Sequence, residues 1–297
     1  MRRKKMYCIY SGKEINESEA NVEHIIPLSL GGSDEFTIMV SKESNSYLGS
    51  KVDGKMTQDF LISMDRVKRD GKGHSKKVPR VDVKSKLDNG NPAITSFTKD
   101  DMKLFDPIKK KYIDIPHKVK MQTKLDLDIR MKFTAKVALA TGYYLFGDKF
   151  VKYSDCQSLR SIMMSDNLKE SMKRASNIRN IRFYDPLLTG KECNADTSFQ
   201  VYQLFVKSNN ASSVVWSFSE KSFIVFVAIY GKFVGMINFE ADTDKFLKED
   251  NFWLGHTLIC QDGQLIRMSW RDAIIEMCEK TGLLDESIIA EAKKFKG

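Results

Sequence analysis

The chain of 297 residues has few cysteines, and none of them forms a Cys-x-x-Cys pair. A structural zinc site built from cysteines and a disulfide framework are therefore both disfavoured. An odd number of scattered cysteines is typical of free thiols in a reducing compartment. The cysteines are Cys8, Cys156, Cys193, Cys260 and Cys278.

The sequence also lacks a long apolar run. A membrane-spanning helix needs roughly 20 apolar residues, whereas the longest apolar stretches, Phe133–Phe146 and Ser222–Ile237, are interrupted by Lys, Gly or Tyr. The basic start at Met1–Met6 is not followed by the apolar segment of a secretory signal. We therefore expect a soluble, cytoplasmic protein with no membrane partner.

No internal repeat is present, and no glycine-rich loop of the nucleotide-binding type is found. The Gly71–Gly73 segment lacks the residues that flank a phosphate-binding loop. Hydrophobic residues make up 42% of the chain, which is enough for substantial cores. The length predicts one large domain or two to three small ones.

Positive charge is in excess, with a net charge of +9, and it is unevenly distributed. The segment Arg66–Lys86 contains nine basic residues but only Asp70 and Asp82 as acidic ones. Such a segment is either a solvated face or mobile loop, or a surface that contacts the phosphates of a nucleic acid. Its basic residues are Arg66, Lys68, Arg69, Lys72, Lys76, Lys77, Arg80, Lys84 and Lys86.

The residue patterns predict an α+β fold. In the N-terminal segment 1–62, strands at Val22–Ile26 and Phe36–Val40 flank a glycine-rich loop, and helical periodicity begins at Lys42. Segment 63–122 has the composition of a basic connector that is partly β. We expect a helical region over 123–190, with a buried helix at Leu125–Phe146.

The C-terminal segment 191–297 has the pattern of an antiparallel sheet with helices. Short connections between its apolar runs favour hairpins. The predicted strands are Gln200–Val206, Ser212–Phe218, Ser222–Ile229 and Phe233–Phe239, and the predicted helices are Trp270–Lys280 and Asp285–Lys294.

Three residues of the N-terminal segment carry the chemistry of a phosphodiesterase. His24 can act as a general base near neutral pH. Glu23 and Asn45 offer oxygen ligands, which suit Mg²⁺ or Mn²⁺. Neighbouring residues of a strand point to opposite faces, so Glu23 and His24 can converge only at a strand end or bulge. Pro27 is consistent with a strand end.

The blocks Cys8–Lys13, Glu23–Gly32 and Ser41–Asp53 resemble the HNH endonuclease family in order and spacing. The resemblance covers about residues 7–56. It implies a ββα-metal finger in which His24 is the general base, while Glu23 and Asn45 bind one catalytic metal ion, Mg²⁺ or Mn²⁺.

One feature departs from the family subgroup that is most similar. Two Cys-x-x-Cys knuckles usually bind a structural zinc ion there, whereas this chain has Cys8, Ser11, Ser41 and Ser44 at the four positions. One cysteine cannot hold a tetrahedral zinc ion, so no structural zinc is expected. The finger must then be stabilised by packing and by contacts with the later segments.

The resemblance implies a metal-dependent endonuclease that cleaves double-stranded DNA, from a bacterium or phage, with a role in restriction, defence or a mobile element. Two copies in a homodimer would allow both strands to be cut. A non-catalytic nucleic-acid-binding module and an RNase remain alternatives. The expected contacts with DNA phosphates are Lys51, Arg66, Lys68, Arg69, Lys72, Lys76, Lys77 and Arg80.

Overall fold

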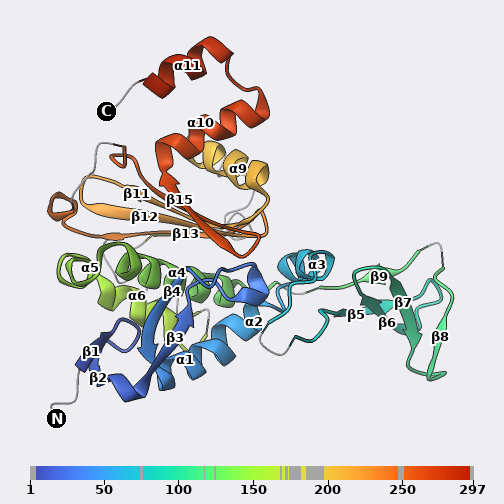
Figure 1. Cartoon of the computed structure of the whole chain (residues 1–297). Coiled ribbons are helices and arrows are strands. Elements are labelled where there is room, and N and C mark those ends of the chain that lie inside the picture. Colours follow the sequence, from blue (N-terminus) through green and yellow to red (C-terminus); the bar gives the residue numbers. More distant parts are fainter. Residues whose placement is uncertain are drawn as a thin grey trace.

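The computed structural model describes residues 5–73, 76–116, 118–123, 125–167, 169–170, 173, 182–184, 197–246 and 251–294. This part of the chain combines helices with antiparallel sheets, so the expected α+β class is confirmed (Figure 1). No helix within these residues is long and apolar enough to span a membrane.

The N-terminal unit consists of two hairpins followed by helices. Strand β3 (Ala20–His24) pairs with β4 (Thr37–Ser41), and α1 (Lys42–Leu48) follows directly. Ser41 caps α1, because its side chain accepts a hydrogen bond from the Ser44 amide. The other elements are β1 (Lys5–Cys8), β2 (Lys13–Asn16), a π-helical turn (Gly49–Asp53), α2 (Gly54–Met56) and α3 (Phe60–Lys68).

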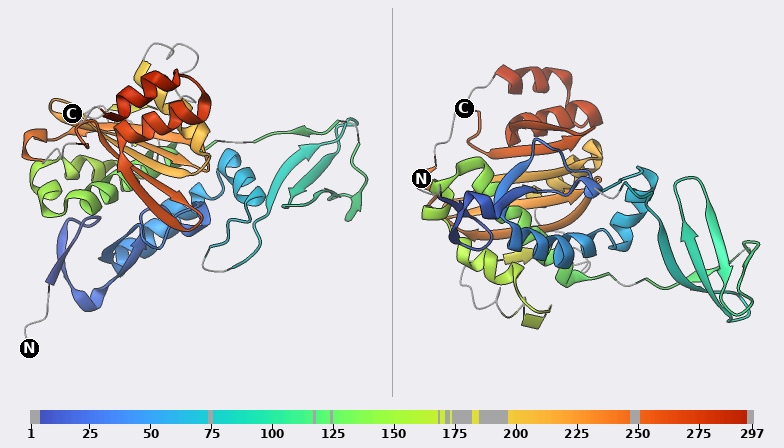
Figure 2. Two further views of the ribbon diagram at one scale, coloured as in Figure 1. Left: turned by 45° about the horizontal axis from the view of Figure 1, so that its top comes forward. Right: turned by 60° about the horizontal axis from the view of Figure 1, so that its bottom comes forward.

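A separate five-stranded antiparallel sheet follows α3 and projects to one side of the molecule (Figures 1 and 2). Segment 63–122, which was expected to be a partly β connector, thus contains the end of α3 and a folded sheet. In the spatial order β8-β7-β6-β5-β9, the strands are Lys111–Ile113, Met102–Asp106, Pro92–Phe97, Val81–Lys86 and Lys120–Met121. In β5, exposed lysines alternate with buried residues, so one face of this sheet forms a core.

The long helix α4 (Leu127–Phe146) matches the predicted buried helix and ends at Gly147. Every residue from Ile129 to Gly142 is buried. The helix lies between the N-terminal unit and a large sheet, so it contacts protein on all sides (Figure 1). Two short helices, α5 (Asp148–Tyr153) and α6 (Cys156–Met163), follow it.

The large sheet has six antiparallel strands in the order β10-β13-β12-β11-β14-β15. One of its faces packs on α4, and α9 (Thr197–Asn209), α10 (Trp270–Thr281) and α11 (Glu286–Lys294) lie on the other side (Figure 1). In the same order, the strands are Arg182–Tyr184, Lys232–Glu240, Ser222–Ile229, Ser212–Phe218, Gly255–Gln261 and Gln264–Ser269.

The predicted strand Gln200–Val206 was wrong, because these residues lie in α9. Tyr202, Phe205 and Val206 are buried at helical spacing against the sheet. The other three predicted strands and both C-terminal helices are present.

A single apolar core joins the N-terminal unit, α4 and the large sheet. It runs from Ile9 and Leu48 through Phe133 to Trp216 and Leu258, all of which are fully buried. The rest of the chain therefore supplies apolar contacts that a unit as small as the N-terminal one needs.

Candidate active site

Strand β3 ends at His24, so the expected strand end is present. Glu23 and His24 both line a pocket of about 230 Å³, together with Asn45 of α1 and Asp53 of the π-helical turn. The structure thus brings together the three residues that the sequence indicated. The pocket is completed by Pro27, Leu28, Ser29, Gly49, Gly54, Thr57 and Gly73.

Glu23 is paired with a buried lysine from the centre of α4. The Lys136 ammonium lies 2.6 Å from Glu23 Oε1 and also 2.6 Å from Asp53 Oδ2. Lys136 is fully buried, and Glu23 is 6% exposed. Two carboxylates from the N-terminal unit therefore share one cation from α4, which ties the two elements together.

Burial sets the protonation behaviour of this cluster. It raises the pKa of Asp53 to about 6; the Lys136 ammonium acts in the opposite direction, and Glu23 adds to the rise. Burial alone would lower the pKa of Lys136, but the Asp53 and Glu23 carboxylates outweigh it, so this pKa is raised. Burial and the same two carboxylates raise the pKa of the nearby Tyr10 well above its usual value.

His24 has an acidic partner of its own. Its Nε2 atom lies 2.8 Å from Asp34 Oδ1, in the loop between β3 and β4. The His24 side chain is 15% exposed, whereas Asp34 is 83% exposed. The carboxylate therefore orients the imidazole from the solvent side.

Asn45 connects α1 to strand β3. Its Nδ2 atom donates hydrogen bonds to Asn21 Oδ1 at 2.9 Å and to the Val22 carbonyl at 3.0 Å. Because these bonds use the amide nitrogen, Oδ1 is the atom of Asn45 that can accept a cation or a water molecule.

The oxygen donors of the pocket fit a hard divalent cation. Asp53 Oδ1 is buried and has no hydrogen-bond partner among the described residues. The Lys136 ammonium offsets only one of the two carboxylates, Glu23 and Asp53, that it contacts. No group of three or more His, Cys, Asp or Glu side chains in the described part is arranged to hold a metal ion. Mg²⁺, however, commonly takes only one or two carboxylates and completes its shell with water and substrate phosphate.

The loop that follows His24 is held by the large sheet. Tyr230 Oη donates to the Ser29 carbonyl at 3.0 Å, and Ser212 Oγ donates to the Leu30 carbonyl at 2.6 Å. Gly31 adopts a φ of +74°, and a Cβ atom there would lie 2.7 Å from the Tyr230 ring. The Leu-Gly-Gly sequence therefore allows the loop to approach the sheet closely.

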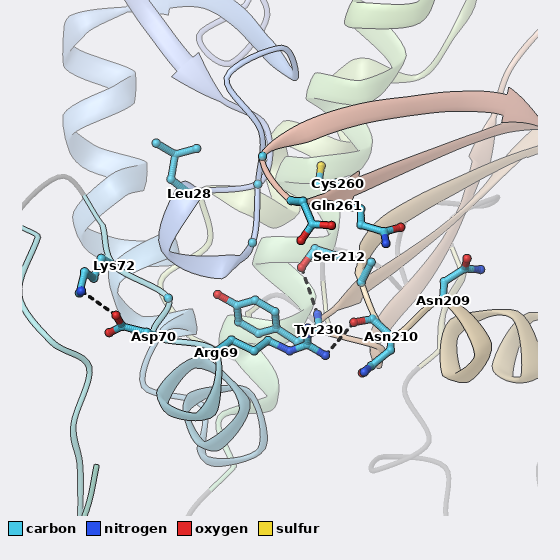
Figure 3. A pocket seen from close by; sticks show the side chains of 16 residues that line it. Leu28, Arg69, Asp70, Lys72, Asn209, Asn210, Ser212, Tyr230, Cys260 and Gln261 are labelled. Carbon is cyan, nitrogen blue, oxygen red and sulfur yellow. Dashed lines mark hydrogen bonds and ion pairs between the residues drawn. The ribbon is translucent and has the colours of Figure 1, made fainter. Parts of the chain in front are cut away.

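A second cavity of about 580 Å³ lies beside this loop, between α3 and the large sheet (Figure 3). Arg69 crosses it, since its guanidinium lies 5.4 Å from the centre of the Tyr230 ring and donates to the Asn210 carbonyl at 2.8 Å. The Arg69 side chain thus links the end of α3 to the large sheet across this cavity.

The four knuckle positions lie together. The Ser41 amide donates to Cys8 Sγ at 3.2 Å, and Ser41 Oγ donates to Ser44 Oγ at 2.8 Å. Burial raises the pKa of the Cys8 thiol, but hydrogen bonds from Ser11 and Ser41 outweigh burial and lower it overall. Hydrogen bonds therefore connect Cys8, Ser41 and Ser44, three of the four positions at which the similar subgroup has cysteines.

The residues proposed to contact phosphates differ in their surroundings. Four of them have partners within the chain: Arg66 donates to the Gly71 carbonyl, Arg69 to the Asn210 carbonyl, Lys72 pairs with Asp70, and Arg80 with Asp82. The other four, Lys51, Lys68, Lys76 and Lys77, are exposed. The structure does not gather all eight around the pocket.

Sequence reasoning missed Lys136 and Asp34 and gave Asp53 only a secondary role. Lys136 had a detectable signal, because a lysine within an apolar helix must be paired when it is buried. Asp34 had none, because its contact with His24 depends on the conformation of the loop.

The β3–β4 hairpin and α1 thus gather a histidine, a carboxylate and a carboxamide in one pocket. Residues 8–61 match the family model described as HNH endonuclease. This segment of the N-terminal part is therefore similar to HNH endonuclease domains. No curated protein and no solved structure matches the chain.

Proposed function

We propose that the protein is a metal-dependent endonuclease that hydrolyses phosphodiester bonds in DNA. The observation that carries this proposal is the convergence of Glu23, His24 and Asn45 in one pocket, within the segment that matches the HNH endonuclease family. The net charge of +9 is suited to a polyanionic substrate.

In this mechanism, His24 removes a proton from the attacking water, and the Asp34 carboxylate stabilises the imidazolium that forms. Glu23 and Asn45 would hold one Mg²⁺ or Mn²⁺ ion, with Asp53 beside them. When bound, the ion supplies positive charge to the developing phosphorane and to the leaving oxygen. Lys136 keeps Glu23 in a fixed position next to the pocket.

The test is cleavage of supercoiled plasmid DNA with Mg²⁺, with Mn²⁺ and with EDTA. His24→Ala is expected to lower the metal-dependent rate by about 10²- to 10⁴-fold, the contribution of a general base. Glu43→Ala, at an exposed position of α1, is the matched control and should cleave like the wild type. Equal cleavage by His24→Ala would remove the proposed base.

One observation favours a second candidate, a non-catalytic nucleic-acid-binding module. Lys136 already neutralises part of the acidic charge that a metal ion needs. This candidate predicts salt-sensitive DNA binding without nicking at any metal concentration. An RNA substrate in the same assay separates a DNase from an RNase. A homodimer, a cytoplasmic location and a role in restriction, defence or a mobile element remain predictions from the resemblance.

A further inference from the structure

The five-stranded sheet β5–β9 has two faces of different character. Residues directly opposite each other in antiparallel strands share a face, so the register assigns each side chain. One face is the small core of this sheet, where Val83, Ala93 and Leu104 are at most 5% exposed and Ser85 Oγ lies 2.9 Å from Thr95 Oγ1.

The opposite face carries basic and aromatic side chains in rows across the strands. One row places Lys84 opposite Ile94, Ile94 opposite Phe105, and Phe105 opposite Tyr112. The neighbouring row contains Lys86 paired with Lys120, and the row on the other side contains Asp82, Ser96 and Lys103.

The aromatic pair lies within the basic face. The Phe105 and Tyr112 ring centres are 5.4 Å apart at an interplanar angle of 67°, and Tyr112 is 58% exposed. Large apolar side chains at the surface mark interaction sites when they cluster. The exposed Tyr112 ring therefore lies next to the half-buried Phe105 ring, and the two form one aromatic patch.

The charge of this face is positive. Lys84, Lys86, Lys103 and Lys120 are exposed on it. Lys103 is paired with Asp101 at 3.5 Å, and Asp82, the acidic residue of these rows, is paired with Arg80 at 2.7 Å. Lys84, Lys86 and Lys120 therefore supply the positive charge of the face. Lysines around accessible aromatic rings are the combination that binds unpaired nucleic acid, because lysines contact phosphates and rings stack on bases. In a duplex the bases already stack on each other, so the rings would have no partner.

We propose that this face, defined by Lys84, Lys86, Lys120, Phe105 and Tyr112, binds a single-stranded segment of nucleic acid. Its phosphates contact the lysines, and at least one base stacks on Tyr112. The sheet projects from the rest of the molecule (Figure 2), so it holds a strand outside the active-site pocket. The inference is compatible with the proposed nuclease function but does not require catalysis.

The test measures fluorescence anisotropy of the full chain in EDTA, where metal-dependent cleavage is absent. The probes are labelled oligothymidylate and oligouridylate of about 16 nucleotides, the upper site size of one binding domain, and a duplex of equal length. We expect tighter binding of the single strands, and the two oligonucleotides distinguish DNA from RNA.

Tyr112→Ala tests stacking, with Tyr112→Phe as its matched control. Loss of one stacked base should weaken single-strand binding by about tenfold, within the range for alanine substitution of stacking residues. The phenylalanine variant should bind like the wild type. Tyr112 is exposed, so both variants should keep the wild-type melting temperature. Equal affinities of Tyr112→Ala and the wild type would overturn the proposal.

The double variant Lys84→Gln/Lys86→Gln tests the phosphate contacts. It should make the slope of log affinity against log salt shallower by about 1.4, from 0.7 per contact on a single strand. Lys109→Gln/Lys110→Gln, in the exposed turn between β7 and β8, removes the same charge away from the face and should keep the slope. If both double variants changed the slope equally, the effect would come from net charge and not from this face, which would overturn the proposal.

Failure of this proposal and failure of the nuclease proposal are distinguishable. His24→Ala should leave single-strand binding intact while cleavage is lost. Conversely, if the wild-type protein binds single strands but does not cleave DNA, this inference holds and the proposed nuclease activity is wrong.

Discussion

Lys136 Nζ lies 2.6 Å from Glu23 Oε1, although the lysine belongs to the central helix α4 and the glutamate to the end of β3. The same nitrogen lies 2.6 Å from Asp53 Oδ2. The buried cation therefore couples the position of the proposed metal ligand to the core of the protein. A change in α4 should be transmitted to the active site through this one side chain.

Lys136→Met should destabilise the protein strongly. Removal of the ammonium leaves Glu23 and Asp53 buried without a counter-ion, which costs about 3–5 kcal/mol. The free energy of unfolding in urea at pH 7.5 measures this effect. The control is Lys280→Met in α10, since Lys280 pairs with Glu276 at the surface and its loss should cost at most about 1 kcal/mol. Similar losses in the two variants would show that the buried pairs contribute little.

The local parts of the site could be predicted from the sequence. Glu23, His24 and Asn45 lie in a hairpin and a following helix, where short-range spacing determines geometry. Lys136 could not be placed, because its contact with Glu23 depends on how α4 packs on the N-terminal unit. The same distinction applies to Asp34, whose position depends on the conformation of a loop.

Errors in the predicted fold have related causes. Gln200–Val206 is rich in residues that favour strands, but burial of Tyr202 and Phe205 on one side of α9 favours a helix. The density of lysines in segment 63–122 suggested a basic connector that is only partly β. The alternation of exposed Lys84 and Lys86 with buried Val83 and Ser85 is instead the pattern of a strand in a folded sheet with a core of its own.

Asp34→Asn should lower cleavage without unfolding the domain. The amide keeps the size of the side chain but loses the charge that stabilises the His24 imidazolium. Because Asp34 is highly exposed, we expect a loss of about tenfold in kcat, the low end of the range for residues that orient site histidines. Steady-state cleavage and melting temperature should be measured together. Glu43→Gln, at an exposed position of α1, is a control for charge alone. If Asp34→Asn left the cleavage rate unchanged, the contact between Asp34 and His24 would have no role in catalysis.

Restoring the knuckle cysteines should create a zinc site. Hydrogen bonds already link Cys8, Ser41 and Ser44, and tetrahedral zinc holds its thiolates at about 2.3 Å. The variant Ser11→Cys/Ser41→Cys/Ser44→Cys should bind one Zn²⁺ per chain and melt at a higher temperature, and a chelator should reverse both changes. The wild type is the control, and its melting temperature should not respond to EDTA. A variant that folds but binds no zinc would contradict the expected geometry.

The last prediction concerns acid stability and His256, a 4% exposed residue of the large sheet. Burial, assisted by Arg267, lowers the pKa of His256 from 6.5 to about 4. Between these values the unfolded chain binds more protons than the folded one, so this residue removes stability as the pH falls. The shift corresponds to about 3 kcal/mol. Asp53 acts in the opposite direction, because its raised pKa of about 6 makes the folded state lose stability as the pH rises towards that value.

The comparison of His256→Phe with the wild type isolates the contribution of His256. The imidazole stacks on Phe252 at 4.5 Å and contacts Phe146 at 5.6 Å, so phenylalanine should fit among these rings. Urea unfolding at pH 7 and pH 4 should show that the stability of the variant relative to the wild type rises by about 3 kcal/mol at the lower pH. Because Asp53 is present in both proteins, its opposite contribution cancels. Parallel stability curves over this range would mean that His256 takes up its proton in the folded protein near its ordinary pKa.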